Sequence, residues 1–222
     1  MTSYVLVHGV AHGAWCWERT VADLQARGHV ARALDLPLTS HADDVAAVRS
    51  LLDGIDESVV LVGHSYGGHV ISAAAADRDD VDHLVYVAAM MLDADESFVE
   101  ISAAYPQPRL VTALEIGADG RFTIDPKAAV DCFYARCDPA EAEAAVARLR
   151  PTALACVSEP AGAAAWRNHR STYVVCGRDR SIDPDFQRAM ARHADAVVEF
   201  DTDHSPFMSC PAEFVGALAQ IA

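Results

Sequence analysis

Six short apolar runs, each bounded by turn-forming residues, limit most strongly what this chain can fold into. Runs this apolar suit strands that are buried on both faces, as in a parallel sheet. We therefore expect a sheet of about six mainly parallel strands. The runs cover residues 4–7, 29–34, 59–62, 83–87, 172–176 and 197–200.

Helical patterns separate the first of these runs. The first pattern repeats apolar residues at helical spacing from Trp17 to Leu24, and Gly28 is placed to end it. Ser40, with an acidic residue three positions later, resembles a capping box and predicts the start of a second helix. A third helix is expected over residues 66–76. This alternation predicts an α/β fold with right-handed crossovers.

The interval between residues 88 and 172 is far longer than the dozen or so residues that a parallel crossover requires. Asp125 and Asp138 are each followed by proline, the pattern of an N-cap with proline at the first helical position, and Arg150-Pro151 is expected to end the second helix. We interpret the interval as a small helical cap that shapes a pocket; stabilisation alone is the alternative. The expected division is a core of residues 1–90 and 170–222 with a cap of residues 91–169.

Composition limits the partners. With 222 residues and 52% hydrophobic content, one globular domain is expected. A formal net charge of −15 argues against nucleic acid and anionic membranes as partners, and favours a neutral small-molecule substrate. The oligomeric state stays open, with a homodimer as one alternative.

The six cysteines have no metal-type spacing, and no histidine or cysteine cluster suggests a metal or cofactor, so none is expected. Scattered thiols of this kind suit a reducing compartment or small buried side chains. The chain also lacks the pattern of a signal peptide or a membrane-spanning run. We expect a cytoplasmic protein.

Ser65 stands in the sequence Gly63-His64-Ser65-Tyr66-Gly67, which matches the G-x-S-x-G nucleophile elbow. An apolar strand precedes it and a helical pattern follows, as the elbow requires. The neighbouring glycines permit the close backbone approach of a tight turn. A plain turn serine is the alternative, but the context favours a nucleophile.

An elbow serine needs a histidine base and an acid, and both follow it later in the chain. Asp179 and His204 come just after two late strands, at the sheet edge where Ser65 lies. Asp93 is the reserve candidate for the acid. Asp183, Asp201 and Asp203 are expected to be loop acids or helix caps. His193 is expected to lie at the surface. His64 and His69 are too close to Ser65 in the sequence to act as its base.

Two backbone amides are expected to form an oxyanion hole. One belongs to Tyr66, which follows the nucleophile, and the other to Val10, in the loop after the first strand. A turn that merely ends the strand is the alternative for His8-Gly9.

These motifs together resemble the plant methylesterase and hydroxynitrile lyase branch of the α/β-hydrolase superfamily. They are the run from Val7 to Trp17, the elbow, Cys176-Gly177-Arg178-Asp179 and Asp203-His204, with a cap resembling the family's at residues 133–138 and 148–151. The resemblance covers nearly the whole chain and implies an α/β-hydrolase fold with a cap after the fourth strand. Its members hydrolyse small methyl esters or cleave cyanohydrins. The cap looks shorter than in plant relatives.

We expect a cofactor-free serine carboxylesterase with a Ser65–His204–Asp179 triad that acts on small neutral methyl or aryl esters. A hydroxynitrile lyase is the nearest alternative. The lyases of this family have threonine where this chain has Gly9, and lysine where it has Ser205. A low-turnover binding protein of the same fold and a thioesterase are further alternatives. The aromatic residues Phe133 and Tyr134 are expected in the cap's own core.

Overall fold

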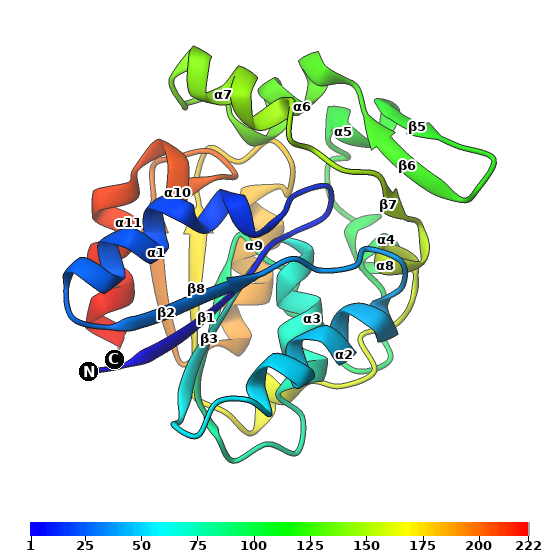
Figure 1. Ribbon diagram of the computed structural model, residues 1–222. Helices are drawn as coiled ribbons and strands as arrows, with labels where there is room; N and C mark the ends of the chain where they lie inside the picture. Colours follow the sequence, from blue (N-terminus) through cyan, green and yellow to red (C-terminus); the bar gives the residue numbers. More distant parts are fainter. Residues whose placement is uncertain (222) are drawn as a thin grey trace.

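The six apolar runs lie side by side in one parallel sheet. In the computed structural model, which describes residues 1–221, the strand order is β2-β1-β3-β4-β8-β9 (Figure 1). All neighbouring strands of this sheet are parallel, so their carboxyl ends share one edge. Each strand begins and ends within two residues of its predicted bounds. The strands are β1 (Ser3–Val7), β2 (Val30–Leu34), β3 (Val59–His64), β4 (Val81–Val87), β8 (Ser171–Cys176) and β9 (Ala196–Phe200).

Helices cover both faces of the sheet, so the central strands β1 and β3 are buried on both sides. Side chains such as Leu6 and Val62 pack against α1 and α11, whereas Val5 and Leu61 pack against α2, α3 and α9. The helices of this core are η1 (Ala14–Trp17), α1 (Glu18–Ala26), α2 (His41–Leu52), α3 (Tyr66–Ala74), α9 (Pro184–Met190), η3 (Ala191–His193), α10 (Pro206–Ser209) and α11 (Pro211–Ile221).

Local signals explain where these helices begin and end. The Ser40 hydroxyl accepts a hydrogen bond from the amide of Asp43, as the capping pattern predicts. Gly28, just after α1, has a φ of 85°, a backbone conformation that glycine adopts without strain. The turns that place strand ends are therefore encoded locally.

The segment between β4 and β8 contains strands as well as helices, so the expectation of a purely helical cap is incomplete. Three short strands form an antiparallel sheet in the order β5-β6-β7 within the described residues. Figure 1 shows α6, α7, β5 and β6 above the carboxyl edge of the parallel sheet. The elements are α4 (Phe98–Ser102), α5 (Arg109–Thr112), β5 (Leu114–Ile116), β6 (Arg121–Ile124), α6 (Pro126–Phe133), α7 (Pro139–Val146), β7 (Thr152–Ala153), α8 (Ala155–Ser158) and η2 (Ala165–Arg167).

Asp125 and Asp138 cap α6 and α7 as predicted, each accepting two backbone hydrogen bonds. The second of these helices ends at Val146, before Arg150-Pro151, so these residues do not end it. We refer to residues 91–169 as the cap segment. Its last part returns to the core, where Cys156 and Trp166 pack in the same hydrophobic cluster as α2 and α3.

No helix of the described residues is long and apolar enough to cross a membrane.

Candidate active site

Ser65 occupies a strained turn between β3 and α3. Its φ of 54° and ψ of −123° lie outside the regions that residues with a side chain normally adopt. The Ser65 amide donates to the carbonyl of Val87 at 3.1 Å, and the Ser65 carbonyl accepts from the amides of Gly68 and Met90 at 3.0 Å each. These bonds to the end of β4 and the start of α3 hold the strained residue in place.

Two glycines make this turn sterically possible. A Cβ atom on Gly63 would lie 2.5 Å from the carbonyl oxygen of Gly67, and one on Gly67 would lie 2.5 Å from the carbonyl oxygen of Val7. Such contacts are far inside van der Waals distance. The strand-to-helix turn therefore requires glycine at both positions, as the elbow pattern predicts.

Asp179 and His204, predicted from separate strand ends, meet at the same sheet edge. Asp179 Oδ2 accepts a hydrogen bond from His204 Nδ1 at 2.6 Å, and both side chains are buried. Asp179 Oδ1 also accepts from the amides of Ser181 and Ile182, at 2.6 and 3.0 Å. Because the carboxylate can only accept here, the imidazole proton sits on Nδ1 and the Nε2 lone pair is free to act as a base.

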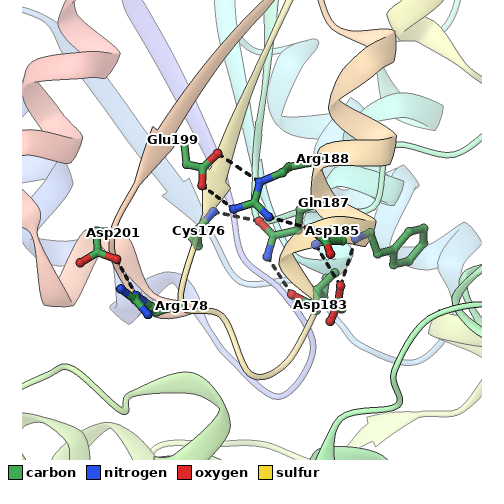
Figure 2. A network of polar contacts seen from close by, with 10 residues as sticks. Cys176, Arg178, Asp183, Asp185, Gln187, Arg188, Glu199 and Asp201 are labelled. Atoms are coloured by element: carbon green, nitrogen blue, oxygen red, sulfur yellow. Dashed lines mark hydrogen bonds and ion pairs between the residues drawn. The ribbon is translucent and has the colours of Figure 1, made fainter.

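Gln187, from α9, completes the carboxylate's surroundings and is not among the residues expected from the sequence. Its Nε2 donates to Asp179 Oδ2 at 2.7 Å and to the Ile182 carbonyl at 2.8 Å, while its Oε1 accepts from the Cys176 amide at 2.9 Å. Figure 2 shows Gln187 reaching across to Cys176 at the end of β8. Nothing in a glutamine eight positions after an aspartate signals this role.

His64 connects the elbow to the loop that carries His204. Its Nε2 donates to the carbonyl of His204 at 2.8 Å, and the two rings lie 4.5 Å apart between centroids. Burial, with the neighbouring His204, lowers the pKa of His64 well below its usual value, so this ring is neutral. In the described residues the Ser65 hydroxyl makes no hydrogen bond to His204. Such bonds are often long before substrate binds.

The residues expected to supply the oxyanion amides are Tyr66 and Val10. Tyr66 is the first residue of α3, where helix amides have no intrahelical acceptor. Val10, in the loop after β1, has an amide with no hydrogen-bond partner among the described residues, and its side chain lines the same cavity as Ser65. In the described residues, both amides are thus free to donate a hydrogen bond to a ligand.

A cavity of about 230 Å³ opens beside Ser65 and Val10. This volume exceeds that of an apolar cavity of about 150 Å³ that binds benzene. Its lining is mainly apolar and comes largely from the cap segment. The apolar lining includes Met90, Phe98, Tyr105, Leu110, Leu114, Phe122, Ile182 and Phe186.

The other acids take separate positions. Asp93, the reserve candidate, pairs with Arg167 at 2.6 Å and not with His204. Asp183 caps α9, and Asp201 forms an exposed pair with Arg178, as expected for a helix cap and a loop acid.

Asp203 differs from its expected role as a solvated acid or helix cap, because its side chain is fully buried. Its Oδ2 accepts from the Arg136 amide of the cap segment at 2.7 Å, and its Oδ1 accepts from the Ser205 amide at 3.2 Å. Asp203 therefore ties the cap segment to the loop that carries His204.

A third buried carboxylate, that of Asp44, contacts Tyr66 of the elbow. Asp44 Oδ2 accepts from the Tyr66 hydroxyl at 2.7 Å, and Asp44 Oδ1 accepts from the Leu38 amide at 2.8 Å. Burial raises the pKa of Asp44, and the hydrogen bond from Tyr66 opposes that rise. The sequence places Asp44 in a helix and gives no signal of this contact.

The remaining predicted residues lie as expected in most cases. His69 is buried in α3 beside His41, with 4.1 Å between ring centroids, and His193 is exposed. Phe133 and Tyr134 belong to the cap's own core and also contact the site, since Phe133 stacks on His204 at 5.4 Å. Among the described residues, no group of three or more histidine, cysteine, aspartate or glutamate side chains is placed to hold a metal ion.

Comparison with known proteins agrees with this architecture. The model of the alpha/beta hydrolase family matches residues 4–217. Methylesterase 7 and methylesterase 2 of Arabidopsis thaliana are 30% and 31% identical to the chain, and each alignment covers 99% of the chain and 95% of the relative. The crystal structure of polyneuridine aldehyde esterase superposes with a TM-score of 0.86 over 100% of this chain and 99% of the other, at 24% identity, which supports the fold. The resemblance found in the sequence is confirmed, and the chain belongs to the alpha/beta hydrolase family.

Proposed function

We propose that this protein is a serine carboxylesterase that hydrolyses small neutral esters through an acyl-enzyme. The observation that carries the proposal is the strained turn at Ser65, which lies at the same sheet edge as the hydrogen-bonded pair of Asp179 and His204. The relatives named methylesterases support an ester as the substrate.

The proposed first half-reaction forms the acyl-enzyme. His204 Nε2 removes the proton of the Ser65 hydroxyl as its oxygen attacks the ester carbonyl. Asp179 keeps the imidazole in the required tautomer and stabilises the imidazolium ion. The amides of Val10 and Tyr66 hold the developing oxyanion, and His204 then protonates the departing alcohol.

Water completes the second half-reaction by the same route. His204 takes a proton from water as the water oxygen attacks the acyl carbonyl, and it returns the proton to Ser65 as the acid leaves. None of these steps requires a cofactor. The free thiols of the six cysteines support the cytoplasmic location that we propose for this reaction.

The apolar cavity beside Ser65 supports methyl or aryl esters with an apolar acyl part. A cyanohydrin lyase is less well supported, because the position after His204 is the uncharged and buried Ser205, which cannot stabilise a cyanide leaving group.

Hydrolysis of p-nitrophenyl acetate and butyrate, without added metal, tests the proposal. We expect turnover by the wild type and by Ser158→Ala, a control at an exposed serine of α8. Ser65→Ala should lose the activity by several orders of magnitude, since removing a triad nucleophile costs about 10⁶-fold in kcat. A wild type no faster than Ser65→Ala on either ester contradicts the proposal.

A further inference from the structure

The loop after β1 carries the Val10 amide that the proposed function needs, and two buried histidines hold the peptide groups around it. His8 Nδ1 donates to the Gly9 carbonyl at 2.8 Å, and His12 Nδ1 donates to the Val10 carbonyl at 2.8 Å. In a planar trans peptide the carbonyl and the following N–H point in opposite directions. A donor on the Gly9 carbonyl therefore sets the direction of the Val10 N–H.

The tautomer of His8 is fixed by its other nitrogen. The Leu36 amide donates to His8 Nε2 at 3.0 Å, and Arg150 Nη2 lies 3.3 Å from the same atom. Both groups can only donate, so Nε2 carries a lone pair and the proton resides on Nδ1. Burial, together with the Arg150 charge, lowers the pKa of His8 to about 4.

The tautomer of His12 is fixed by the Val10 carbonyl, and a tyrosine of the cap segment holds the other ring nitrogen. The Tyr134 hydroxyl lies 2.7 Å from His12 Nε2. Because His12 Nδ1 faces a carbonyl and must carry the proton, the neutral ring accepts from Tyr134 at Nε2. Burial lowers the pKa of His12 to about 3, which keeps the ring neutral.

Arg150 and Thr152 of the cap segment hold the rest of the loop. The Arg150 amide donates to the Ala11 carbonyl at 2.7 Å, and Arg150 Nε donates to the His12 carbonyl at 2.9 Å. Thr152 Oγ1 accepts from the Ala11 amide at 2.9 Å. Ala11 has a φ of 60°, which costs free energy for a non-glycine residue, so these bonds hold the loop in a conformation it would not otherwise prefer.

We propose that His8 and His12 are positioning residues for the oxyanion amide of Val10, that Arg150 of the cap segment fixes the tautomer of His8, and that Tyr134 of the cap segment holds the ring of His12 in place. This inference rests on the proposed function. The cap segment would then have a second role besides shaping the pocket. Its hydrogen bonds would orient the Val10 amide, which donates to the oxyanion of the transition state.

Replacing the ester carbonyl oxygen with sulfur tests the inference, because sulfur accepts hydrogen bonds weakly. The variants are Tyr134→Phe and Arg150→Met, assayed on p-nitrophenyl butyrate and on the matching thionoester. Tyr4→Phe and Arg49→Met are matched controls. Tyr4 donates to the Leu218 carbonyl of α11, and Arg49 donates to the Ala73 and Ala74 carbonyls at the end of α3.

We expect Tyr134→Phe and Arg150→Met to lower kcat on the oxygen ester by about tenfold, less than the loss of a whole oxyanion donor. KM should stay nearly unchanged. The thionoester should lose much less, so the ratio of the two rates falls in these variants and stays at the wild-type value in both controls. A merely structural role would lower both rates together.

The tautomers are checked without any turnover. Two-bond proton–nitrogen NMR spectra of the wild type should show His8 and His12 as neutral rings protonated at Nδ1. An Nε2-protonated His12 overturns the inference, as does an unchanged rate ratio in an active Tyr134→Phe enzyme. A wild type that hydrolyses neither ester overturns the proposed function instead, and with it any catalytic role for the two histidines.

Discussion

At the scale of single residues, the site depends on backbone positions that ordinary side chains avoid. The conformation of Ser65 costs on the order of 1–3 kcal/mol. Its hydrogen bonds to Val87, Gly68 and Met90, which are all buried residues, hold it there. The hydroxyl is thus presented at the sheet edge before any substrate arrives.

A side chain at Gly9 would force neighbouring atoms of this protein to move. A Cβ atom there would lie 2.7 Å from Ser65 Cβ and 3.2 Å from the His64 carbonyl oxygen. We expect Gly9→Ala to destabilise the protein by about 1–3 kcal/mol, as overpacking does, and to lower kcat because the nucleophile and the oxyanion loop are forced apart. Urea unfolding and p-nitrophenyl butyrate hydrolysis measure the two effects. A fully active Gly9→Ala variant would contradict this contact.

Gln187→Met should weaken both the protein and the triad. The substitution leaves the buried Cys176 amide unpaired and removes one donor from Asp179. We expect a loss of about 1–3 kcal/mol in the free energy of unfolding, together with a lower kcat. Gln25→Met, which removes a half-buried bond of 3.3 Å to the Ala31 carbonyl, is the control and should keep its kcat. Equal kcat values for the two variants would contradict a role of Gln187 in positioning Asp179.

At the scale of elements, the sequence predicts the parallel sheet well because buried strands and capped helices depend on local patterns. It does not predict the small sheet of the cap segment, since β5 and β6 are short, and β5 in particular is largely exposed. Asp119-Gly120, between these two strands, is a hairpin signal that was available in the sequence. The contacts of Gln187 and Arg150 arise only from tertiary packing, so no local pattern reveals them.

The hydrogen bonds of Asp203 connect the cap segment to the loop that carries His204, and a substitution at Asp203 tests them. Asp203→Asn replaces one acceptor oxygen by an NH₂ group that faces a backbone donor, either Arg136 or Ser205. We expect a loss of about 1–3 kcal/mol in the free energy of unfolding, because a buried donor is left unpaired. The kcat should fall as well, since this loop carries His204.

Asp201→Asn is the matched control, two residues away on the same loop. Its pair with Arg178 is exposed, and exposed ion pairs contribute little to stability because water screens them. Urea unfolding curves of both variants give the comparison. If Asp203→Asn unfolded at the same urea concentration as Asp201→Asn, the buried hydrogen bonds of Asp203 would have no measurable stabilising effect.

At the scale of the whole molecule, buried neutral histidines dominate the response to acid. Burial lowers the pKa values of His8 to about 4 and of His12 and His69 to about 3, from an ordinary value of 6.5. The pKa of His64 is lowered as well. In the unfolded chain these rings protonate near pH 6.5, whereas in the folded protein they stay neutral.

The unfolded state therefore binds more protons than the folded state between about pH 4 and 6.5, so stability rises with pH in this range and is lost as pH falls. Each such histidine contributes roughly 1 kcal/mol of loss between pH 7 and 5.5. His8, His12 and His69 together therefore remove about 3 kcal/mol of a typical stability of about 5–15 kcal/mol. Urea unfolding at pH 7.5, 6.5 and 5.5 measures the slope. His69→Leu should lower the slope of the free energy of unfolding against pH. The unfolded variant has one titrating imidazole fewer than the unfolded wild type, so it binds up to one proton fewer. A free energy of unfolding that did not change over this range would show that these rings are protonated in the folded protein.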